Sequence, residues 1–236
     1  MTQQKNIPDN LTKIIYDYLF LFEFLKLLKP KNSLEIGVYK GLTFQLLHKY
    51  SKHSLGVEIN YENKSRYSYP QEWDIVFKDS FLLTQDDLGS NKFFDFIHID
   101  GCHGYEAVIN DLEKCLPHIN NTTIICVDDY THMKEVSDGV KTFMKSNKKF
   151  FLKSIGISQA FFVTGESEII FDQTVANFKK EMVTLLQLKP ILKTMINPVD
   201  ETDMYVIEKL SKEKQFAYLQ NTIKDYLKLS HISNLV

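Results

Sequence analysis

Short apolar runs alternate with amphipathic stretches along most of the chain. The apolar runs are predicted strands at Ser33–Ile36, Ser54–Ile59, Trp73–Phe77, Phe93–Ile99, Thr122–Val127, Phe150–Ile155 and Ala160–Thr164. The stretches between them are predicted helices at Leu42–Tyr50, Tyr105–Leu116 and Lys134–Ser146. This alternation favours an α/β fold with a mostly parallel, seven-stranded sheet and helices on both faces. The tight connection between the last two strands predicts one antiparallel edge strand.

The two ends of the chain carry helical patterns and no strand pattern. Apolar residues recur at helical spacing from Leu11 to Leu28, and Pro30 ends this predicted helix. In the C-terminal part the predicted helices are Val175–Leu188, Val199–Leu210 and Lys212–Leu229. We therefore expect an N-terminal helix over 1–30, a central domain over 31–166 and a helical extension over 167–236. The extension covers the sheet, contacts another subunit or closes over a substrate, and the sequence leaves these roles open.

Composition and charge narrow the class of protein. Of 236 residues, 44% are hydrophobic and 25% are charged, which is typical of a globular chain. The net charge is −2 and Arg66 is the only arginine, so nothing favours binding to duplex nucleic acid. The three cysteines lack metal-binding spacing. The first residues are polar, and no apolar run is long enough to span a membrane, so we expect a cytoplasmic protein.

Candidate ligand-binding residues follow the predicted strands, because ligands bind at the carboxyl ends of the strands in open α/β sheets. After the first strand, Glu35 precedes Gly37 and Gly41 in a turn that lacks the dinucleotide-binding glycine fingerprint. An acidic residue there suits an amine-bearing ligand, and a purely structural turn is the alternative. Glu58 ends the second strand, where a carboxylate can accept both hydroxyls of a ribose. Asp79, after the third strand, is a candidate acceptor for an adenine amino group or a helix cap.

The strongest local signal follows the fourth and fifth strands. Asp100 ends the fourth strand and His103 comes three residues later, whereas Asp128 and Asp129 directly follow the fifth. Adjacent carboxylates repel unless a cation or hydrogen bonds neutralise them. If the two strands are neighbours, three carboxylates converge into an oxygen site suited to Mg²⁺, Mn²⁺ or Ca²⁺ rather than Zn²⁺. The alternative is that Asp128 and Asp129 only cap the next helix.

These motifs together resemble the class I S-adenosylmethionine-dependent methyltransferases, over about residues 30–165. The turn from Leu34 to Gly41 is similar to that of the catechol and caffeoyl-CoA enzymes. The run from Phe94 to Glu106, with Asp111 downstream, is similar to the macrocin and mycinamicin sugar O-methyltransferases and the cephalosporin hydroxylase–type family. The metal-binding pair of the catechol-type enzymes is Asp-Asn, whereas this chain has Asp128-Asp129. This difference favours the sugar-type branch. The resemblance implies a Rossmann-like methyltransferase fold.

The resemblance also implies roles for individual residues. Cofactor contacts would come from Glu35, Gly37, Gly41 and Glu58, with Asp79 and Ser80 near the adenine. Asp100, Asp128 and Asp129 would bind the metal, Mg²⁺ or Mn²⁺. His103, at the position of the proposed base, and Asp100 would be catalytic.

The sequence therefore predicts a metal-dependent O-methyltransferase that acts on a hydroxyl of a small molecule, a sugar or a glycosylated metabolite. A bound divalent cation lowers the pKa of such a hydroxyl, and a general base adds about 10²–10⁴-fold. Two alternatives stay open: a metal-independent N- or peptide methyltransferase, and a non-catalytic protein that uses the fold for binding or assembly. The expected partner is a small molecule and not nucleic acid or a membrane. Formation of a homo-oligomer through the terminal helices stays open.

Overall fold

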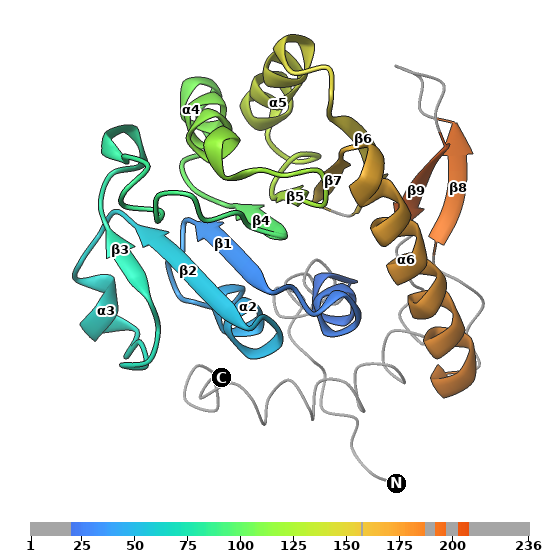
Figure 1. Ribbon diagram of the computed structural model, residues 1–236, viewed down its shortest axis with the longest axis horizontal. Helices are drawn as coiled ribbons and strands as arrows, with labels where there is room; N and C mark the ends of the chain where they lie inside the picture. Colours follow the sequence, from blue (N-terminus) through green and yellow to red (C-terminus); the bar gives the residue numbers. More distant parts are fainter. Residues whose placement is uncertain (1–19, 157, 187–191, 197–202, 208–236) are drawn as a thin grey trace, which may run out of the picture.

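The protein contains one continuous mixed sheet with helices on both faces. The computed structural model describes residues 20–156, 158–186, 192–196 and 203–207. Within these residues the sheet has nine strands in the order β3-β2-β1-β4-β5-β7-β6-β9-β8 (Figure 1). The strand order reverses between β1 and β4, which places the carboxyl ends of these two strands beside the point where α/β sheets bind ligands.

The elements follow the alternation in the sequence closely. The strands are β1 (Asn32–Ile36), β2 (His53–Glu58), β3 (Ile75–Phe77), β4 (Phe96–Ile99), β5 (Ile124–Val127), β6 (Phe151–Ile155), β7 (Ala160–Val163), β8 (Leu192–Ile196) and β9 (Asp203–Ile207). The helices are α2 (Phe44–Tyr50), α3 (Asn63–Arg66), α4 (Tyr105–Cys115), α5 (Lys134–Ser146) and α6 (Gly165–Leu186), with 3₁₀ turns η1 (Ser80–Leu82) and η2 (Leu116–His118). Residues 20–28 are also helical.

Strand directions confirm the predicted α/β class and refine its sheet. β1 to β5 pair in parallel, β7 pairs antiparallel with both β5 and β6, and the seven predicted strands form one block of the sheet. The antiparallel strand β7 lies between β5 and β6, not at the edge. β9 then pairs in parallel with β6, and β8 pairs antiparallel with β9 at the sheet edge.

The C-terminal extension is only partly helical. The helix predicted at Val175–Leu188 is confirmed up to Leu186, where α6 ends, and its last two residues lie outside the described ones. α6 begins earlier than predicted, and Lys153 on β6 pairs with Glu168 (2.7 Å) and Asp172 (3.1 Å) on α6. The helix predicted at Val199–Leu210 is wrong for Asp203–Ile207, which forms β9, and β8 was not predicted. Five-residue apolar segments do not distinguish strand from helix, and pairing with the β6 edge decides the outcome. The helix predicted at Lys212–Leu229 lies outside the described residues.

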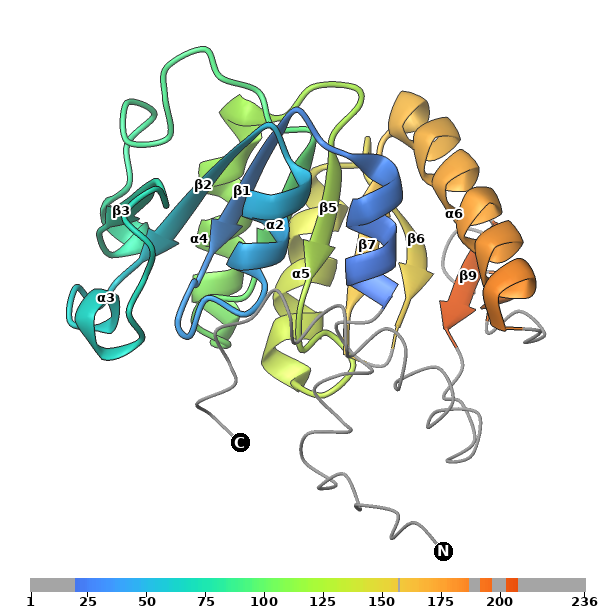
Figure 2. The same cartoon turned by 90° about the horizontal axis from the view of Figure 1, so that it is seen from below.

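Alternating side chains of the strands build two hydrophobic layers. On one face Ile125 and Val127 of β5 pack with α4 and α5. On the other face Ile124 and Cys126 pack with α2, α6 and the helix over residues 20–28 (Figure 2). This last helix confirms part of the predicted N-terminal helix, whose residues 11–19 lie outside the described ones. Among the described helices, none combines the length and apolar character needed to cross a membrane.

Candidate active site at the carboxyl edge of the sheet

Two loops at adjacent strand ends carry the candidate catalytic residues. β4 and β5 are parallel neighbours, with Ile99 paired to Val127, so the residues that follow them emerge side by side. The loop after β4 carries Asp100 and His103, and the loop after β5 carries Asp128 and Asp129. The sequence-based expectation that these two strands are neighbours is confirmed.

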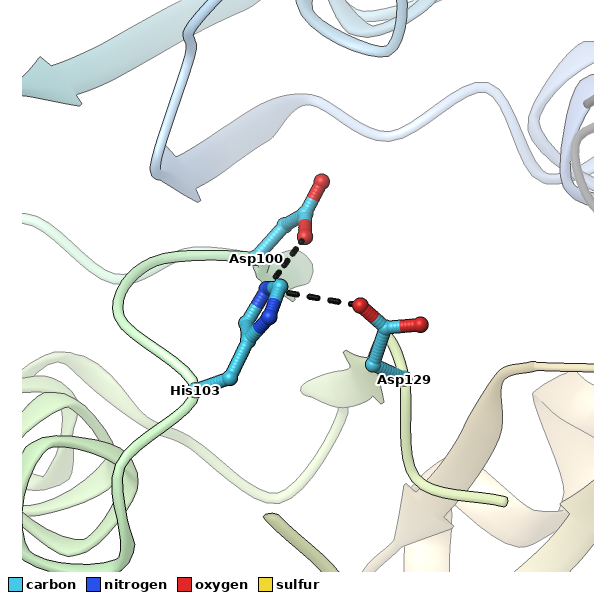
Figure 3. A group of neighbouring side chains, drawn as sticks. All are labelled: Asp100, His103 and Asp129. Carbon is cyan, nitrogen blue, oxygen red and sulfur yellow. Dashed lines mark ion pairs between the residues drawn. The ribbon is translucent and has the colours of Figure 1, made fainter. Parts of the chain in front are cut away.

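Asp100, His103 and Asp129 form a compact cluster. His103 Nε2 lies 3.6 Å from Asp100 Oδ1 and 3.4 Å from Asp129 Oδ2, so the imidazole stands between the two carboxylates (Figure 3). One potential ligand atom from each residue lies within 4.8 Å of the others. Two carboxylates and an imidazole are a donor set that fits a divalent cation.

Burial and charge perturb this cluster. Burial raises the pKa of Asp100, and the interaction with His103 opposes this rise. The pKa of His103 is also raised, chiefly by its interaction with the Asp100 carboxylate, while partial burial opposes the rise and Asp129 adds to it. The carboxylates thus favour a positive charge between them, which either a protonated imidazole or a cation supplies.

Asp128 does not join the cluster. It is buried, and its Oδ1 accepts hydrogen bonds from Ser158 Oγ (2.7 Å) and from the backbone N–H of Asp129 (2.9 Å). The structure therefore brings together two of the three carboxylates expected to converge, with a histidine in the third place. The backbone of Asp129 is left-handed (φ +53°), a conformation rarely adopted by residues other than glycine and common at functional sites.

A further histidine lies beside Asp129. His132 Nδ1 is 3.7 Å from Asp129 Oδ1, so the two carboxylate oxygens of Asp129 face two different imidazoles. In the sequence His132 follows Asp129 by three residues, and this spacing is the signal that could place it near the site.

The turn after β1 requires its glycines. Gly37 has φ +94°, and a Cβ atom there would lie 2.0 Å from the carbonyl oxygen of Asp100. Gly41 has φ +75°, and a Cβ atom there would lie 2.5 Å from the ring of Trp73. The turn after β1 therefore packs directly on the backbone of Asp100. The predicted cofactor-binding turn and the predicted catalytic loop are thus in contact.

Glu58 fixes the turn after β1 to the end of β2. Its buried carboxylate accepts hydrogen bonds from the backbone N–H of Tyr39 (2.7 Å), the backbone N–H of Asn60 (2.9 Å) and Asn63 Nδ2 (3.1 Å). A carboxylate offers about four acceptor positions, so these bonds leave room for a ligand hydroxyl. Tyr39 itself has φ +46°, a second left-handed residue at this edge.

Glu35 lies inside the protein. Its side chain is 1% exposed, and Oε1 is 2.9 Å from Nδ1 of the equally buried His98. Burial raises the pKa of Glu35 to about 7, and the hydrogen bond with His98 limits the rise. Within the described part of the chain, Oε2 of Glu35 has no hydrogen-bond partner. In the sequence His98 alternates with Ile97 and Ile99, which predicts a hydrogen-bond partner in the core but does not identify it as Glu35.

The two residues expected near the adenine lie after β3. Asp79 precedes the 3₁₀ turn η1, and its Oδ1 accepts the backbone N–H of Phe81 (3.0 Å), so the capping alternative holds for that oxygen. Ser80 Oγ lies 3.4 Å from Nδ2 of Asn110 on α4. This segment is therefore tied to the helix that follows the Asp100–His103 loop.

Comparisons with known proteins agree with this architecture. Residues 34–130 match a family model described as a methyltransferase domain. The TDP-rhamnose 3′-O-methyltransferase CalS11, an enzyme in calicheamicin biosynthesis, aligns with a TM-score of 0.50 and 15% identity, over 69% of this chain and 89% of that chain. No curated protein matches the chain significantly.

Two further solved structures align with lower TM-scores. An O-methyltransferase from Bacillus cereus in complex with SAH has a TM-score of 0.46 and 16% identity, over 67% of this chain and 83% of that chain. The N-methyltransferase NodS from Bradyrhizobium japonicum has a TM-score of 0.48 and 11% identity, over 67% of this chain and 99% of that chain.

The fold and the matched segment define the class of protein. The segment over residues 34–130 contains both loops of the Asp100–His103–Asp129 cluster and the turn after β1. It matches a methyltransferase domain, and the chain shares its Rossmann-like fold with CalS11.

Proposed function

We propose that this protein is an S-adenosylmethionine-dependent methyltransferase, and that it transfers the methyl group to a hydroxyl oxygen of a small molecule with the help of a divalent cation. The observation that carries the proposal is the contact between the turn after β1 and the loop after β4. A Cβ atom on Gly37 would lie 2.0 Å from the carbonyl oxygen of Asp100. A cofactor on the turn and a cation at Asp100 and Asp129 would therefore be neighbours.

On the cofactor side, the proposal assigns the turn at Gly37 and Gly41 to the methionine part of the cofactor. Glu58 would accept a ribose hydroxyl, in keeping with its one remaining acceptor position. Asp79 and Ser80 would lie near the adenine. Oε2 of Glu35 is buried and has no hydrogen-bond partner among the described residues. Because an unpaired buried acceptor is costly, this oxygen would accept a hydrogen bond from the amino group of the cofactor.

On the acceptor side, Asp100 and Asp129 would hold the divalent cation. When bound, such an ion lowers the pKa of an acceptor hydroxyl and fixes its orientation. His103 stands between the two carboxylates, within reach of the same position. Asp128 would support the loop through Ser158 without binding the ion.

A vicinal diol on a sugar is the acceptor that this arrangement suits best, because two neighbouring oxygens can chelate one ion. The Asp128-Asp129 pair resembles the sugar-type branch of the methyltransferases. CalS11, a TDP-rhamnose 3′-O-methyltransferase, shares the fold and offers TDP-rhamnose as a probe.

Binding and transfer measurements on the full chain test the proposal. SAH at about 100 times its Kd should raise the Tm by roughly 5–10 °C. With SAH present, Mg²⁺ or Mn²⁺ should raise the Tm further, and EDTA should reverse this. Asp129→Asn should abolish the cation effect, whereas Asp74→Asn, an exposed carboxylate before β3, should leave it intact. Transfer to TDP-rhamnose or catechol should stop in EDTA.

The outcomes separate the alternatives. The metal-independent enzyme is favoured if SAH stabilises the chain, a cation adds no further stability to the wild type or to any variant, and transfer continues in EDTA. A chain that SAH does not stabilise would favour a protein that uses the fold for binding or assembly.

A further inference from the structure

We infer that His103 is a ligand of the divalent cation and that its nitrogen makes the site select a first-row transition ion such as Mn²⁺ over Mg²⁺. The inference rests on the proposed metal dependence and adds to it the third ligand and the identity of the ion.

The first argument is the position of one atom. His103 Nε2 approaches both carboxylates, at 3.6 Å from Asp100 Oδ1 and 3.4 Å from Asp129 Oδ2 (Figure 3). Two ligand atoms about 2.1 Å from one ion are at most about 4.2 Å apart. Both distances lie below this limit, so one ion can bind Nε2 together with an oxygen of either carboxylate.

The second argument concerns the carboxylate that is missing from the group. Asp128, which would have completed an all-oxygen site, directs Oδ1 to Ser158 and to the backbone N–H of Asp129. The compact group therefore consists of two carboxylates and one imidazole. A nitrogen takes the place that a third oxygen would have in a site suited to Mg²⁺.

The surroundings of Asp129 support this arrangement. His132 Nδ1 lies 3.7 Å from Oδ1 of Asp129, whereas His103 approaches the other carboxylate oxygen, Oδ2. A charged or polar partner on the second oxygen orients a ligating carboxylate, so His132 is a positioning residue in this scheme. Asp129, whose carboxylate oxygens approach both imidazoles, also has a left-handed backbone (φ +53°).

The ligand set determines which ion is preferred. Mg²⁺ binds oxygen ligands and keeps several waters, whereas imidazole suits Zn, Cu, Fe and Ni, and Mn²⁺ lies at the oxygen-preferring end of the first-row series. Mn²⁺ is the weakest binder of the first-row series, so a preference for Mn²⁺ over Mg²⁺ is the most demanding form of the prediction. A ring nitrogen bound to the ion has no lone pair left for a proton. His103 would therefore act as a ligand and not as the general base that the sequence suggested.

Electron paramagnetic resonance of Mn²⁺ on the full chain tests the inference directly. In the wild type we expect ¹⁴N modulation from one imidazole on the bound Mn²⁺, and Mg²⁺ should displace the ion only in large excess. His103→Gln, which offers an amide oxygen, should remove the ¹⁴N modulation and weaken Mn²⁺ binding by at least about 10–100-fold, the loss already seen when outer partners of ligands are removed. The affinities for Mn²⁺ and Mg²⁺ should then become similar.

Two histidine variants serve as controls. His53→Gln changes an exposed histidine at the amino end of β2 and should match the wild type. His132→Gln should keep the ¹⁴N modulation, because His132 lies outside the ligand group.

The wild-type spectrum decides the question even if His103→Gln fails to fold. Bound Mn²⁺ without ¹⁴N modulation would overturn the inference and leave the metal dependence standing. Modulation that disappears in His132→Gln would also overturn it, because it would assign the nitrogen to the other histidine. A chain that binds neither Mn²⁺ nor Mg²⁺ would overturn both the inference and the proposed metal dependence, while SAH binding remains a separate measurement.

Discussion

Glu35 on β1 and His98 on β4 form a hydrogen-bonded pair inside the protein, with 2.9 Å between Oε1 and Nδ1 and at most 1% of either side chain exposed. The two residues occupy paired positions in adjacent parallel strands, and Cys126 occupies the next paired position on β5. Interaction with Cys126 and Glu35 raises the pKa of His98 although burial opposes the rise. A polar row thus crosses the sheet below the turn proposed to hold the cofactor.

Loss of one partner of this pair should be costly. Because both groups are fully buried, His98→Leu leaves the Glu35 carboxyl group without its partner, and we expect the free energy of unfolding to fall by about 3–5 kcal/mol. Urea unfolding followed by circular dichroism measures this change. The matched control is the double variant Glu35→Met/His98→Leu, which replaces the pair with apolar groups and should lose clearly less than the sum of the single variants. Strict additivity of the single losses would show that the pair is not coupled.

The sequence indicated this polar row only in part. Period-two alternation placed His98 inside a strand, and from that a buried hydrogen-bond partner was predicted correctly. The partner is Glu35, which is 63 positions away in the sequence. Its identity depends on β1 and β4 being neighbours in register, and that register is a property of the assembled sheet. The fold as a whole follows the same rule. Alternation of apolar and polar residues predicts where strands and helices lie in the sequence, whereas the order of the strands depends on their pairing in the assembled sheet.

The cluster of Asp100, His103 and Asp129 shows what sequence neighbourhood alone does not predict. Spacing and strand ends correctly located Asp100, His103 and Asp129 at one edge of the sheet. Asp128 was expected beside them because it is adjacent to Asp129 in the sequence. Oδ1 of Asp128 instead accepts a hydrogen bond from Ser158, which lies in the connection between β6 and β7. This contact forms only when β7 pairs beside β5, so the sequence around Asp128 does not reveal it.

Gly37 should be intolerant of any side chain. Its backbone is left-handed, and a Cβ atom would lie 2.0 Å from the carbonyl oxygen of Asp100 and 2.4 Å from the carbonyl carbon. Because the obstacle is backbone, Gly37→Ala must separate the turn after β1 from the loop after β4. We expect a loss of about 3–5 kcal/mol in the free energy of unfolding, measured in urea.

Gly165→Ala is the matched control for this substitution. No atom lies within 4 Å of a Cβ atom on Gly165, which begins α6, so this variant should stay close to the wild type. Equal stabilities of the two variants would contradict the close contact between the turn and the loop.

Asp111 on α4 is a buried acid directly beneath the loop that begins at Asp100. A Cβ atom on Gly101 would lie 2.7 Å from Asp111 Oδ2. Burial raises the pKa of Asp111 to about 6, while hydrogen bonds from Ser80 and Asn110 limit the rise. Asp111 therefore connects the stability of α4 to pH in the mildly acidic range.

The pH dependence follows from this raised pKa. The folded chain keeps the Asp111 proton up to about pH 6, whereas an unfolded aspartate loses it near pH 3.9, so the folded state binds more protons between these values. Stability from this group is present at low pH and is lost as the pH rises through about 6, by about 3 kcal/mol in total. Asp111→Asn should remove this loss, so its stability relative to the wild type should increase from pH 4 to pH 7 in urea unfolding. Asp74→Asn, which removes an exposed charge, should show no such trend. A constant difference between Asp111→Asn and the wild type across this range would mean that Asp111 titrates normally in the folded protein.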